Sequence, residues 1–256
     1  MSGNAKGKPA SGTVYLVGAG PGDPGLVTLK AVELLKAADV VVYDHLVGPE
    51  TLAFAREGAE MVDAGKSGSR HVLEQDEINE LLADRASRGM AVVRLKGGDP
   101  FLFGRGGEEA AYLKRRGIAF EVVPGVTSAL AVPAAAGIPV THRGLASAVT
   151  IVTGHESTGK PGPAVDWGAV ARLDSTIVVL MGAGNIRGIA EKVIAGGRPE
   201  DTPVAVVQNG TTRDQSVVVG TLADIARRAE EAGVGPPAVI VIGEVVRMRE
   251  DLEGHT

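Results

Sequence analysis

The chain has 256 residues, of which 44% are hydrophobic and 22% are charged, and this composition is typical of a globular protein. Its length suffices for one large domain or for two of ordinary size. The net charge of −5 and the aromatic content of 3% argue against a nucleic-acid partner, because phosphate backbones attract cations and unpaired bases stack on exposed aromatic rings.

Several kinds of site are disfavoured by what the sequence lacks. It contains no cysteine, which excludes disulfides, thiolate catalysis and cysteine-bound metals. Its five histidines show no metal-ligand spacing, so we expect no metal. The polar residues 1–12 predict a disordered tail rather than a signal peptide, and no apolar run approaches the length of a membrane span. We therefore expect a cytoplasmic protein with no membrane partner.

The first half of the chain alternates short apolar runs with helical patterns. These predict strands at 14–17, 40–43, 91–95 and 120–123 and helices at 29–37, 75–87 and 106–115. A rhythm of strand, helix and strand is typical of a mostly parallel sheet covered by helices. We assign this half to an N-terminal α/β domain at 13–140.

The segment 134–144 breaks this rhythm, and we place the domain boundary in it, after residue 140. A second series of strands is predicted at 149–153, 176–180, 204–207, 216–219 and 238–242, with helices at 186–195 and 221–232. Only a short polar loop, 208–214, joins the third and fourth of these strands, which indicates an antiparallel pair. The sequence therefore predicts a second α/β domain at 141–256 with a mixed sheet.

The loop at 96–109, KGGDPFLFGRGGEE, is the most informative stretch of the chain. It follows the predicted strand 91–95 and leads into a predicted helix. Glycine lets the backbone approach a ligand closely, and open α/β sheets bind small molecules at the carboxyl ends of their strands. We interpret this loop as part of a small-molecule site rather than as a simple connection.

A second glycine-rich loop, 18–25, follows the first predicted strand and reads GAGPGDPG. It resembles the dinucleotide fingerprint G-x-G-x-x-G, with Asp44 in the place of the ribose-binding acid. However, Asp23 stands at the third glycine, and Pro21 and Pro24 lack the N–H groups that would hold a pyrophosphate. A nicotinamide site is therefore the weaker interpretation, and a rigid loop shaped for another ligand is the stronger one.

Five segments in the same order resemble the tetrapyrrole methylases. They are GAGPGDP at 18–24, VYDHLV at 42–47, GGDPFLFGRGGEE at 97–109, PGVTSA at 124–129 and GIPVTHR at 137–143. The resemblance runs from about Val14 to about Val246. The ending GRGGEE is its most specific part and is typical of the members that methylate uroporphyrinogen III. His45 is a departure, since relatives often carry arginine there.

The resemblance implies a reaction and a fold. The reaction is S-adenosylmethionine-dependent methylation of uroporphyrinogen III at C2 and C7 to give precorrin-2, the branch point toward sirohaem and cobalamin. The fold has two α/β domains, with a mostly parallel N-terminal sheet, a mixed C-terminal sheet and an active-site cleft between the domains, in a homodimer. The chain has no room for the dehydrogenase/ferrochelatase module that many relatives carry, so we expect its reaction to stop at precorrin-2.

Three alternatives remain open at this point. The nearest is a later precorrin methyltransferase of corrin synthesis. The others are a nicotinamide oxidoreductase and a non-catalytic nucleotide-binding protein. Stabilisation by S-adenosylhomocysteine or by NAD would separate the methylase from the oxidoreductase, and methyl transfer would separate the enzyme from a sensor.

The resemblance also implies which residues hold the methyl donor. They are Pro21, Gly97, Gly98, Asp99, Leu102, Thr127, Ser128, Met181 and Gly210. Several of them have a structural explanation as well. Asp99 is also interpretable as a turn or helix-capping acid, Thr127 and Ser128 as a helix N-cap, and Met181 as a core residue.

On the acceptor side, the resemblance implies that Asp44 is the proton acceptor and Lys66 the proton donor. The alternatives are a helix-capping role for Asp44 and a solvated loop charge for Lys66. The substrate carries eight carboxylates, so cations are expected to line its site; the candidates are Lys66, Arg70, Lys96, Arg105, His142, Arg143 and Arg213. The family pattern favours Arg105 and Arg143, because a guanidinium binds a carboxylate with two hydrogen bonds.

Overall fold

The computed structural model describes residues 9–65, 73–155 and 165–252, and its contacts divide the chain into two compact units, Met1–Thr127 and Ser128–Thr256. The division falls before the boundary at residue 140 that we expected from the sequence. Helix α5 (Ser128–Ala135) accounts for the difference, because it packs on strands of the second sheet. We describe each unit by itself.

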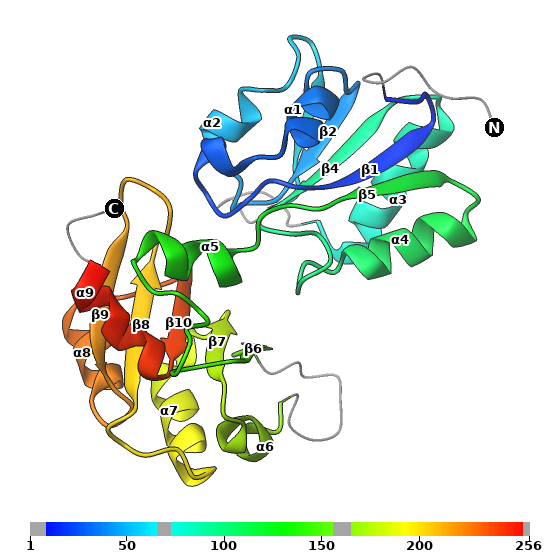
Figure 1. The fold of residues 1–256 in the computed structure, drawn as a ribbon. Coiled ribbons are helices and arrows are strands. Elements are labelled where there is room, and N and C mark those ends of the chain that lie inside the picture. The colour runs from blue at the N-terminus through cyan, green and yellow to red at the C-terminus, as the bar shows by residue number, and fades with distance from the viewer. Residues whose placement is uncertain (1–8, 66–72, 156–164, 253–256) are drawn as a thin grey trace. The chain divides into compact units, whose positions relative to one another are not determined.

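The first unit contains a five-stranded sheet in the order β3-β2-β4-β1-β5, and every neighbouring pair is parallel (Figure 1). The strands are β1 (Thr13–Gly18), β2 (Val40–Tyr43), β3 (Glu60–Asp63), β4 (Val92–Lys96) and β5 (Ala119–Val123). The predicted parallel sheet is thereby confirmed. Strand β3 was not predicted, because this edge strand is largely exposed and carries no apolar run.

Helices cover both faces of this sheet. They are α1 (Leu29–Leu35), α2 (Pro49–Leu52), α3 (Gln75–Ser87) and α4 (Gly106–Arg115). Alternate strand residues serve the two faces: Val14 and Val92 pack with α3 and α4, whereas Val17 and Val93 pack with α1. The Thr28 hydroxyl caps α1, and Glu74 and Glu77 form a capping box at the start of α3. Local signals and core packing therefore agree in this unit.

The chain leaves β2 toward β3, but it leaves β4 toward β5 in the opposite direction. Open α/β sheets bind ligands at the carboxyl ends of the strands at such a reversal. The sheet order therefore directs attention to the residues that follow β2 and β4.

The second unit contains a mixed sheet in the order β6-β7-β10-β8-β9. Its strands are β6 (Val149–Thr153), β7 (Thr176–Leu180), β8 (Pro203–Gln208), β9 (Ser216–Thr221) and β10 (Ala238–Ile242). Strands β6 and β7 are parallel, β10 is antiparallel to both β7 and β8, and β8 and β9 form the antiparallel pair that the short loop predicted. The predicted mixed sheet is confirmed.

The helices of the second unit besides α5 are α6 (Trp167–Arg172), α7 (Ile186–Ala195), α8 (Ile225–Glu231) and α9 (Met248–Leu252). The core between α6, α7, α8 and the sheet consists mainly of valine, isoleucine and alanine, with Trp167 as its one large aromatic residue. Within the described part of the chain, no helix has the length and apolar character needed to cross a membrane.

Candidate active site

Three loops at the carboxyl edge of the first sheet meet backbone to backbone. Gly18 ends β1, Gly98 follows β4, and Gly125 follows β5. A Cβ added at Gly18 would lie 2.5 Å from both the Gly125 Cα and the Gly98 carbonyl oxygen, so a side chain cannot be accommodated at this junction. Gly98 also exchanges two backbone hydrogen bonds with Gly20, at 2.7 and 3.2 Å. The glycines therefore serve first to close the three loops on one another.

Asp99 reinforces this junction. Its Oδ1 accepts a hydrogen bond from the Phe101 N–H at 2.8 Å, and its Oδ2 accepts one from the Gly125 N–H at 3.0 Å. The carboxylate therefore connects the loop after β4 to the loop after β5. The turn-acid interpretation of Asp99 agrees with this geometry, and a direct contact with the methyl donor stays a prediction.

The loop 18–25 does not have the geometry of a dinucleotide fingerprint. It is followed by a short 3-10 turn, η1 (Pro24–Leu26), which the Asp23 carboxylate caps by accepting from the Gly25 N–H at 2.7 Å. Helix α1 begins only after this turn, and the Thr28 hydroxyl already occupies its N-terminus. In the fingerprint the glycine loop opens directly into a helix whose free N–H groups bind the pyrophosphate. The observed loop argues against a nicotinamide site.

The end of the 96–109 loop is held in a tight conformation. Phe103 and Arg105 have positive φ angles of 54° and 58°, and a Cβ on Gly106 would overlap the Pro100 carbonyl oxygen. Arg105 precedes α4, and its guanidinium forms a bidentate pair with Glu108, at 3.0 and 2.7 Å. This pairing raises the pKa of Arg105 and lowers the pKa of Glu108. The strained turn therefore fixes the backbone position of Arg105, and its guanidinium stays positively charged.

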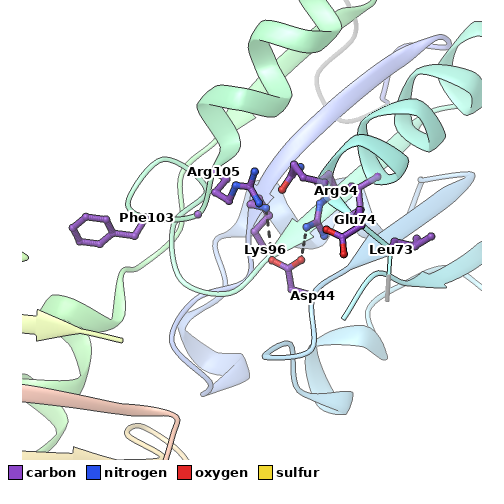
Figure 2. A pocket seen from close by; sticks show the side chains of 10 residues that line it. Asp44, Leu73, Glu74, Arg94, Lys96, Phe103 and Arg105 are labelled. Carbon is purple, nitrogen blue, oxygen red and sulfur yellow. Dashed lines mark hydrogen bonds and ion pairs between the residues drawn. The ribbon is translucent and has the colours of Figure 1, made fainter. Parts of the chain in front are cut away.

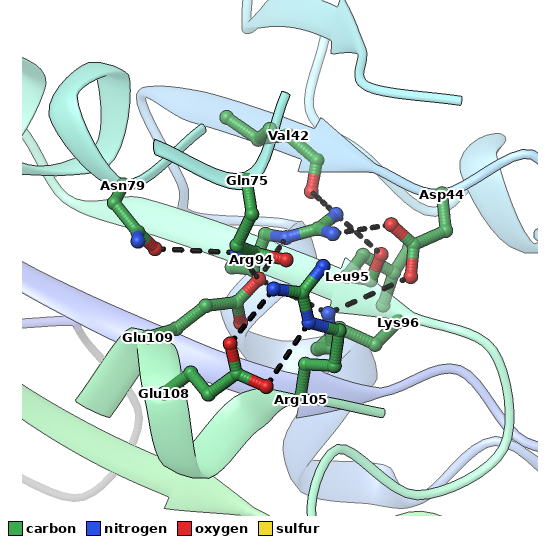
Figure 3. A network of polar contacts seen from close by, with 10 residues as sticks. All are labelled: Val42, Asp44, Gln75, Asn79, Arg94, Leu95, Lys96, Arg105, Glu108 and Glu109. Atoms are coloured by element: carbon green, nitrogen blue, oxygen red, sulfur yellow. Dashed lines mark hydrogen bonds and ion pairs between the residues drawn. The ribbon is translucent and has the colours of Figure 1, made fainter. Parts of the chain in front are cut away.

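A cluster of four charged side chains lies where β2 and β4 end (Figure 3). We refer to Arg94, Lys96, Asp44 and Glu109 as the charge cluster. Arg94 and Lys96 are two residues apart on β4, so both point to the face that α3 and α4 cover. Asp44 follows β2, and its backbone N–H donates to the Leu95 carbonyl at 3.1 Å, which places it beside the end of β4. Glu109 reaches the cluster from α4.

Each cation of the charge cluster contacts both carboxylates. The Arg94 guanidinium pairs with Asp44 and donates from Nε to Glu109 at 3.1 Å. The Lys96 ammonium lies 3.7 Å from Asp44 and 3.1 Å from Glu109. Arg94 is 2% exposed, Lys96 3% and Glu109 0%. Charges so deeply buried require opposite partners, and the two cations and two anions supply them for one another.

Three members of the charge cluster, Asp44, Arg94 and Lys96, line an open pocket of about 310 Å³ (Figure 2). Its polar lining consists of Asp44, Glu74, Gln75, Arg94, Lys96 and Arg105. The Asp44 side chain is 31% exposed, so the carboxylate contacts both the buried cations and solvent. This exposure leaves the Asp44 carboxylate accessible to a ligand in the pocket, and the cations suit an acidic ligand.

The predicted site residues are distributed over both units. Pro21, Gly97, Gly98, Asp99, Leu102, Thr127, Asp44 and Arg105 lie in the first unit, and Ser128, Met181, Gly210 and Arg143 lie in the second. Within the first unit, the structure brings Asp44 and Arg105 to one pocket. The predicted cleft between the domains stays a prediction. Lys66 lies outside the described residues, although Gly65, which precedes it, packs directly against His45.

Two of the predicted residues of the second unit, Met181 and Gly210, lie in strained loops at the carboxyl ends of β7 and β8. Met181 follows β7 with a φ of 56° and is 53% exposed, so it is not a core residue. Gly210 follows β8, between Asn209 and Thr211, which also have positive φ angles, and it packs against Val132 of α5. Arg143 is exposed in the turn between His142 and Ala146. Among described residues, no group of three potential metal ligands is formed, in either unit.

Arg94 and Glu109 were not predicted as site residues. Each stood inside a segment that already had an interpretation, Arg94 in a strand and Glu109 in the glycine-rich motif. A signal was nevertheless present in the alternation of β4. Residues 92, 94 and 96 share one buried face, and that face changes from valine to arginine and lysine toward the carboxyl end. Two adjacent cations on a buried face indicate that carboxylates lie opposite them.

The sequence pattern of the tetrapyrrole (corrin/porphyrin) methylases matches residues 13–226. The chain therefore belongs to this family. It is 52% identical over 252 residues to an S-adenosyl-L-methionine-dependent uroporphyrinogen III methyltransferase of Methanosarcina barkeri, with 98% of this chain and 96% of that protein covered.

Two solved structures are also similar. A uroporphyrin-III C-methyl transferase of Thermus thermophilus, in complex with S-adenosylhomocysteine, is 46% identical, with a TM-score of 0.78 and coverage of 92% of this chain and 99% of that one. A cobalt precorrin-4 methyltransferase has a TM-score of 0.81 and covers 92% of this chain and 96% of that one, but it is only 33% identical. The fold is shared by both, and the sequence is closer to the first.

Proposed function

We propose that this protein transfers methyl groups from S-adenosylmethionine to C2 and C7 of uroporphyrinogen III, giving precorrin-2. The observation that carries the proposal is the 52% identity, over nearly the whole of both chains, to a methyltransferase of that name. The GRGGEE ending, which led to the same acceptor from the sequence, forms the turn that presents Arg105 to the pocket.

The methyl donor is held, in this proposal, by the loops after β1, β4 and β5 together with the carboxyl edge of the second sheet. The residues are Pro21, Gly97, Gly98, Asp99, Leu102, Thr127, Ser128, Met181 and Gly210. These loops carry exposed apolar side chains, among them Phe101 (56%) and Met181 (53%), next to glycine residues such as Gly97 and Gly98. Such a combination suits a ligand with an adenine ring, an aliphatic sulfonium chain and polar hydroxyl and amine groups.

The protein needs no side-chain nucleophile, because the sulfonium of the donor is already activated. The acceptor site holds an electron-rich pyrrole carbon in line with the methyl group, and alignment of this kind can supply much of the rate enhancement. The new C–C bond forms as the C–S bond breaks, and S-adenosylhomocysteine leaves. The methylated ring then carries one extra positive charge, which it loses with a proton. Asp44 accepts that proton in our proposal, and Lys66 is its partner proton donor.

The acceptor is a polyanion, so its carboxylates are bound by cations. Arg105 and Arg143 take this role in the proposal. Arg105 already binds the Glu108 carboxylate in a bidentate geometry, which is the geometry that a substrate carboxylate would use.

A mass measurement tests this function. The protein is incubated with uroporphyrinogen III and isotopically labelled S-adenosylmethionine, and the product is identified by mass and by the positions of the label. A gain of two methyl groups at C2 and C7 is expected. No gain of methyl with this acceptor, together with transfer to a later precorrin, would favour the precorrin methyltransferase instead. Binding of the donor without any transfer would favour the nucleotide-binding protein.

The role of Asp44 has a separate test. Asp44→Asn keeps the shape of the side chain and removes the base, so turnover under saturating donor should fall by about 100-fold, a typical contribution of general-base catalysis. S-adenosylhomocysteine affinity is the control and should be unchanged. Nearly normal turnover would refute the base assignment.

Two further parts of the proposal concern the state of the protein rather than its chemistry. We propose a homodimer located in the cytoplasm. Light scattering during size-exclusion chromatography tests the first, and fractionation of source cells tests the second.

A further inference from the structure

The Asp44 carboxylate is held by two cations on one strand. Arg94 pairs with its Oδ1, and the Lys96 ammonium lies 3.7 Å from its Oδ2. The Arg94 guanidinium is itself fixed by the backbone, because its Nη1 points to the carbonyl oxygens of Val42 and Leu95 at 3.4 and 3.5 Å. The orientation of the carboxylate toward the pocket is therefore set from behind, by groups that solvent does not reach.

Glu109 organises the two cations. Its Oε1 accepts hydrogen bonds from Arg94 Nε and Lys96 Nζ, both at 3.1 Å, and from Gln75 Nε2 at 3.2 Å (Figure 3). Its Oε2 is buried and has no partner among the described residues. One fully buried oxygen thus joins α3, α4 and β4, and the cations that it holds reach Asp44 on their other side.

This arrangement is costly as a purely structural device. Buried ion pairs stabilise a fold little or not at all relative to apolar residues of similar volume, because the charges must be desolvated. Val92 lies on the same buried face of β4 as Arg94 and Lys96, so this face also accommodates an apolar residue. The charges occur only toward the carboxyl end of β4, where Asp44 lies. Their location therefore follows the site rather than the core.

We propose that Arg94 and Glu109 are positioning residues for the methyl-transfer reaction: Glu109 fixes Arg94 and Lys96, and these two cations orient the Asp44 carboxylate toward the substrate pocket. This inference rests on the proposed function, in which Asp44 is the proton acceptor. It predicts that Arg94 and Glu109 act on turnover through Asp44 and not through binding of the methyl donor.

A double-mutant cycle on turnover tests the inference. Arg94→Lys keeps the charge but removes the fork that spans Asp44 and Glu109. We expect it to lower kcat by at least about tenfold, since small misplacements of catalytic groups are expensive, and to leave the KM for S-adenosylmethionine unchanged. In an Asp44→Asn background, the same change should lower kcat by less than about twofold, because residues that act as one unit are not additive. Long incubations with labelled donor make this slow turnover measurable.

Arg85→Lys is the matched control. Arg85 also joins two carboxylates, Glu60 and Asp84, at 2.7 and 2.6 Å, but it does so on α3 away from the pocket. Its replacement should leave kcat unchanged. Glu109→Gln is the second variant, since it keeps the shape of the buried side chain, and it should reproduce the loss of kcat. Thermal unfolding and S-adenosylhomocysteine binding report whether each variant is folded.

The outcomes separate the two levels of the proposal. If wild-type protein transfers no methyl group to uroporphyrinogen III, the proposed function fails and this inference fails with it. If wild-type protein is active but the losses from Arg94→Lys and Asp44→Asn multiply, only the positioning role is overturned. An equal loss of kcat from Arg85→Lys, or folded Arg94→Lys and Glu109→Gln proteins with normal kcat, would overturn it too.

Discussion

The carboxyl edges of the two sheets differ in their content of buried charge. The first sheet ends in the charge cluster, and the three charged residues that are buried in the described part of the chain, Arg94, Lys96 and Glu109, all belong to it. Among the described residues of the second unit, the buried polar residues are the uncharged Ser175, Thr176 and Thr202. Backbone strain occurs at both edges, at Phe103 and Arg105 in the first and in the loops after β7 and β8 in the second. Buried charge is therefore what distinguishes the first edge from the second.

This contrast matches the two halves of the proposed reaction. Proton transfer and binding of a polyanion need charges held in place, which the first edge provides. A donor with an adenine ring needs a shaped surface, and the strained loops after β7 and β8 contribute to one in our proposal. Four experiments test this contrast, beginning with the largest expected effect.

Removing the central anion of the charge cluster should destabilise the first unit selectively. Glu109→Leu leaves Arg94 and Lys96 with too few partners, and breaking a buried pair in this way typically costs about 3–5 kcal/mol of unfolding free energy. Hydrogen exchange of first-unit peptides should accelerate in urea. Trp167, the one tryptophan of the chain, lies in the second unit. Its fluorescence during unfolding should therefore show a smaller loss of stability. Equal losses in both units would show that the cluster is not local in its effect.

The glycine junction should be the next most sensitive feature. Gly125→Ala places a Cβ against the Gly98 carbonyl oxygen, which forces the loops apart at a cost of about 1–3 kcal/mol. If the loops move apart to make room for this Cβ, the proposed donor site changes shape. S-adenosylhomocysteine binding, measured by calorimetry, should then weaken by roughly tenfold or more. Gly107→Ala is the control, because a Cβ there meets nothing within 4 Å. Unchanged affinity in Gly125→Ala would remove these loops from the donor site.

The strained edge of the second unit should show a trade between stability and binding. Met181→Gly removes a positive-φ penalty of about 1 kcal/mol while losing little buried area, because Met181 is 53% exposed. The unfolding free energy should therefore stay level or rise slightly, while the KM for S-adenosylmethionine should increase. A loss of stability with an unchanged KM would assign Met181 to structure alone.

The exposed pair of the first edge should have the smallest effect. Arg105 lowers the pKa of Glu108 below its ordinary value of 4.5. A carboxyl with a lowered folded-state pKa stabilises the fold above pH 4.5, and this contribution is lost as pH falls through the folded-state pKa. Because both side chains are more than half exposed, Glu108→Gln should cost less than about 1 kcal/mol near pH 7. Unfolding curves at pH 7 and pH 4, with and without 1 M salt, check the size and the sign.

The sequence predicted what depends on local periodicity and motif order. The parallel and mixed sheets followed from apolar runs and loop lengths, and Asp44 and Arg105 were assigned to one site before their elements were known to meet. Strand β3 was missed because an exposed edge strand has no apolar pattern, and α6 because its six residues are too few to show a helical period. Arg94 and Glu109 were missed because their significance is a contact between β4 and α4, which no single segment contains.

The junction of Gly18, Gly98 and Gly125 has a consequence for how this site can change. Loops that are joined through side chains can be altered one at a time, since a shorter or longer residue adjusts each contact. Loops that touch through bare backbone cannot be widened or narrowed without moving β1, β4 and β5 apart. At this junction, sequence variation is therefore confined to the flanking side chains, and any ligand that binds there has to fit an unchanged backbone.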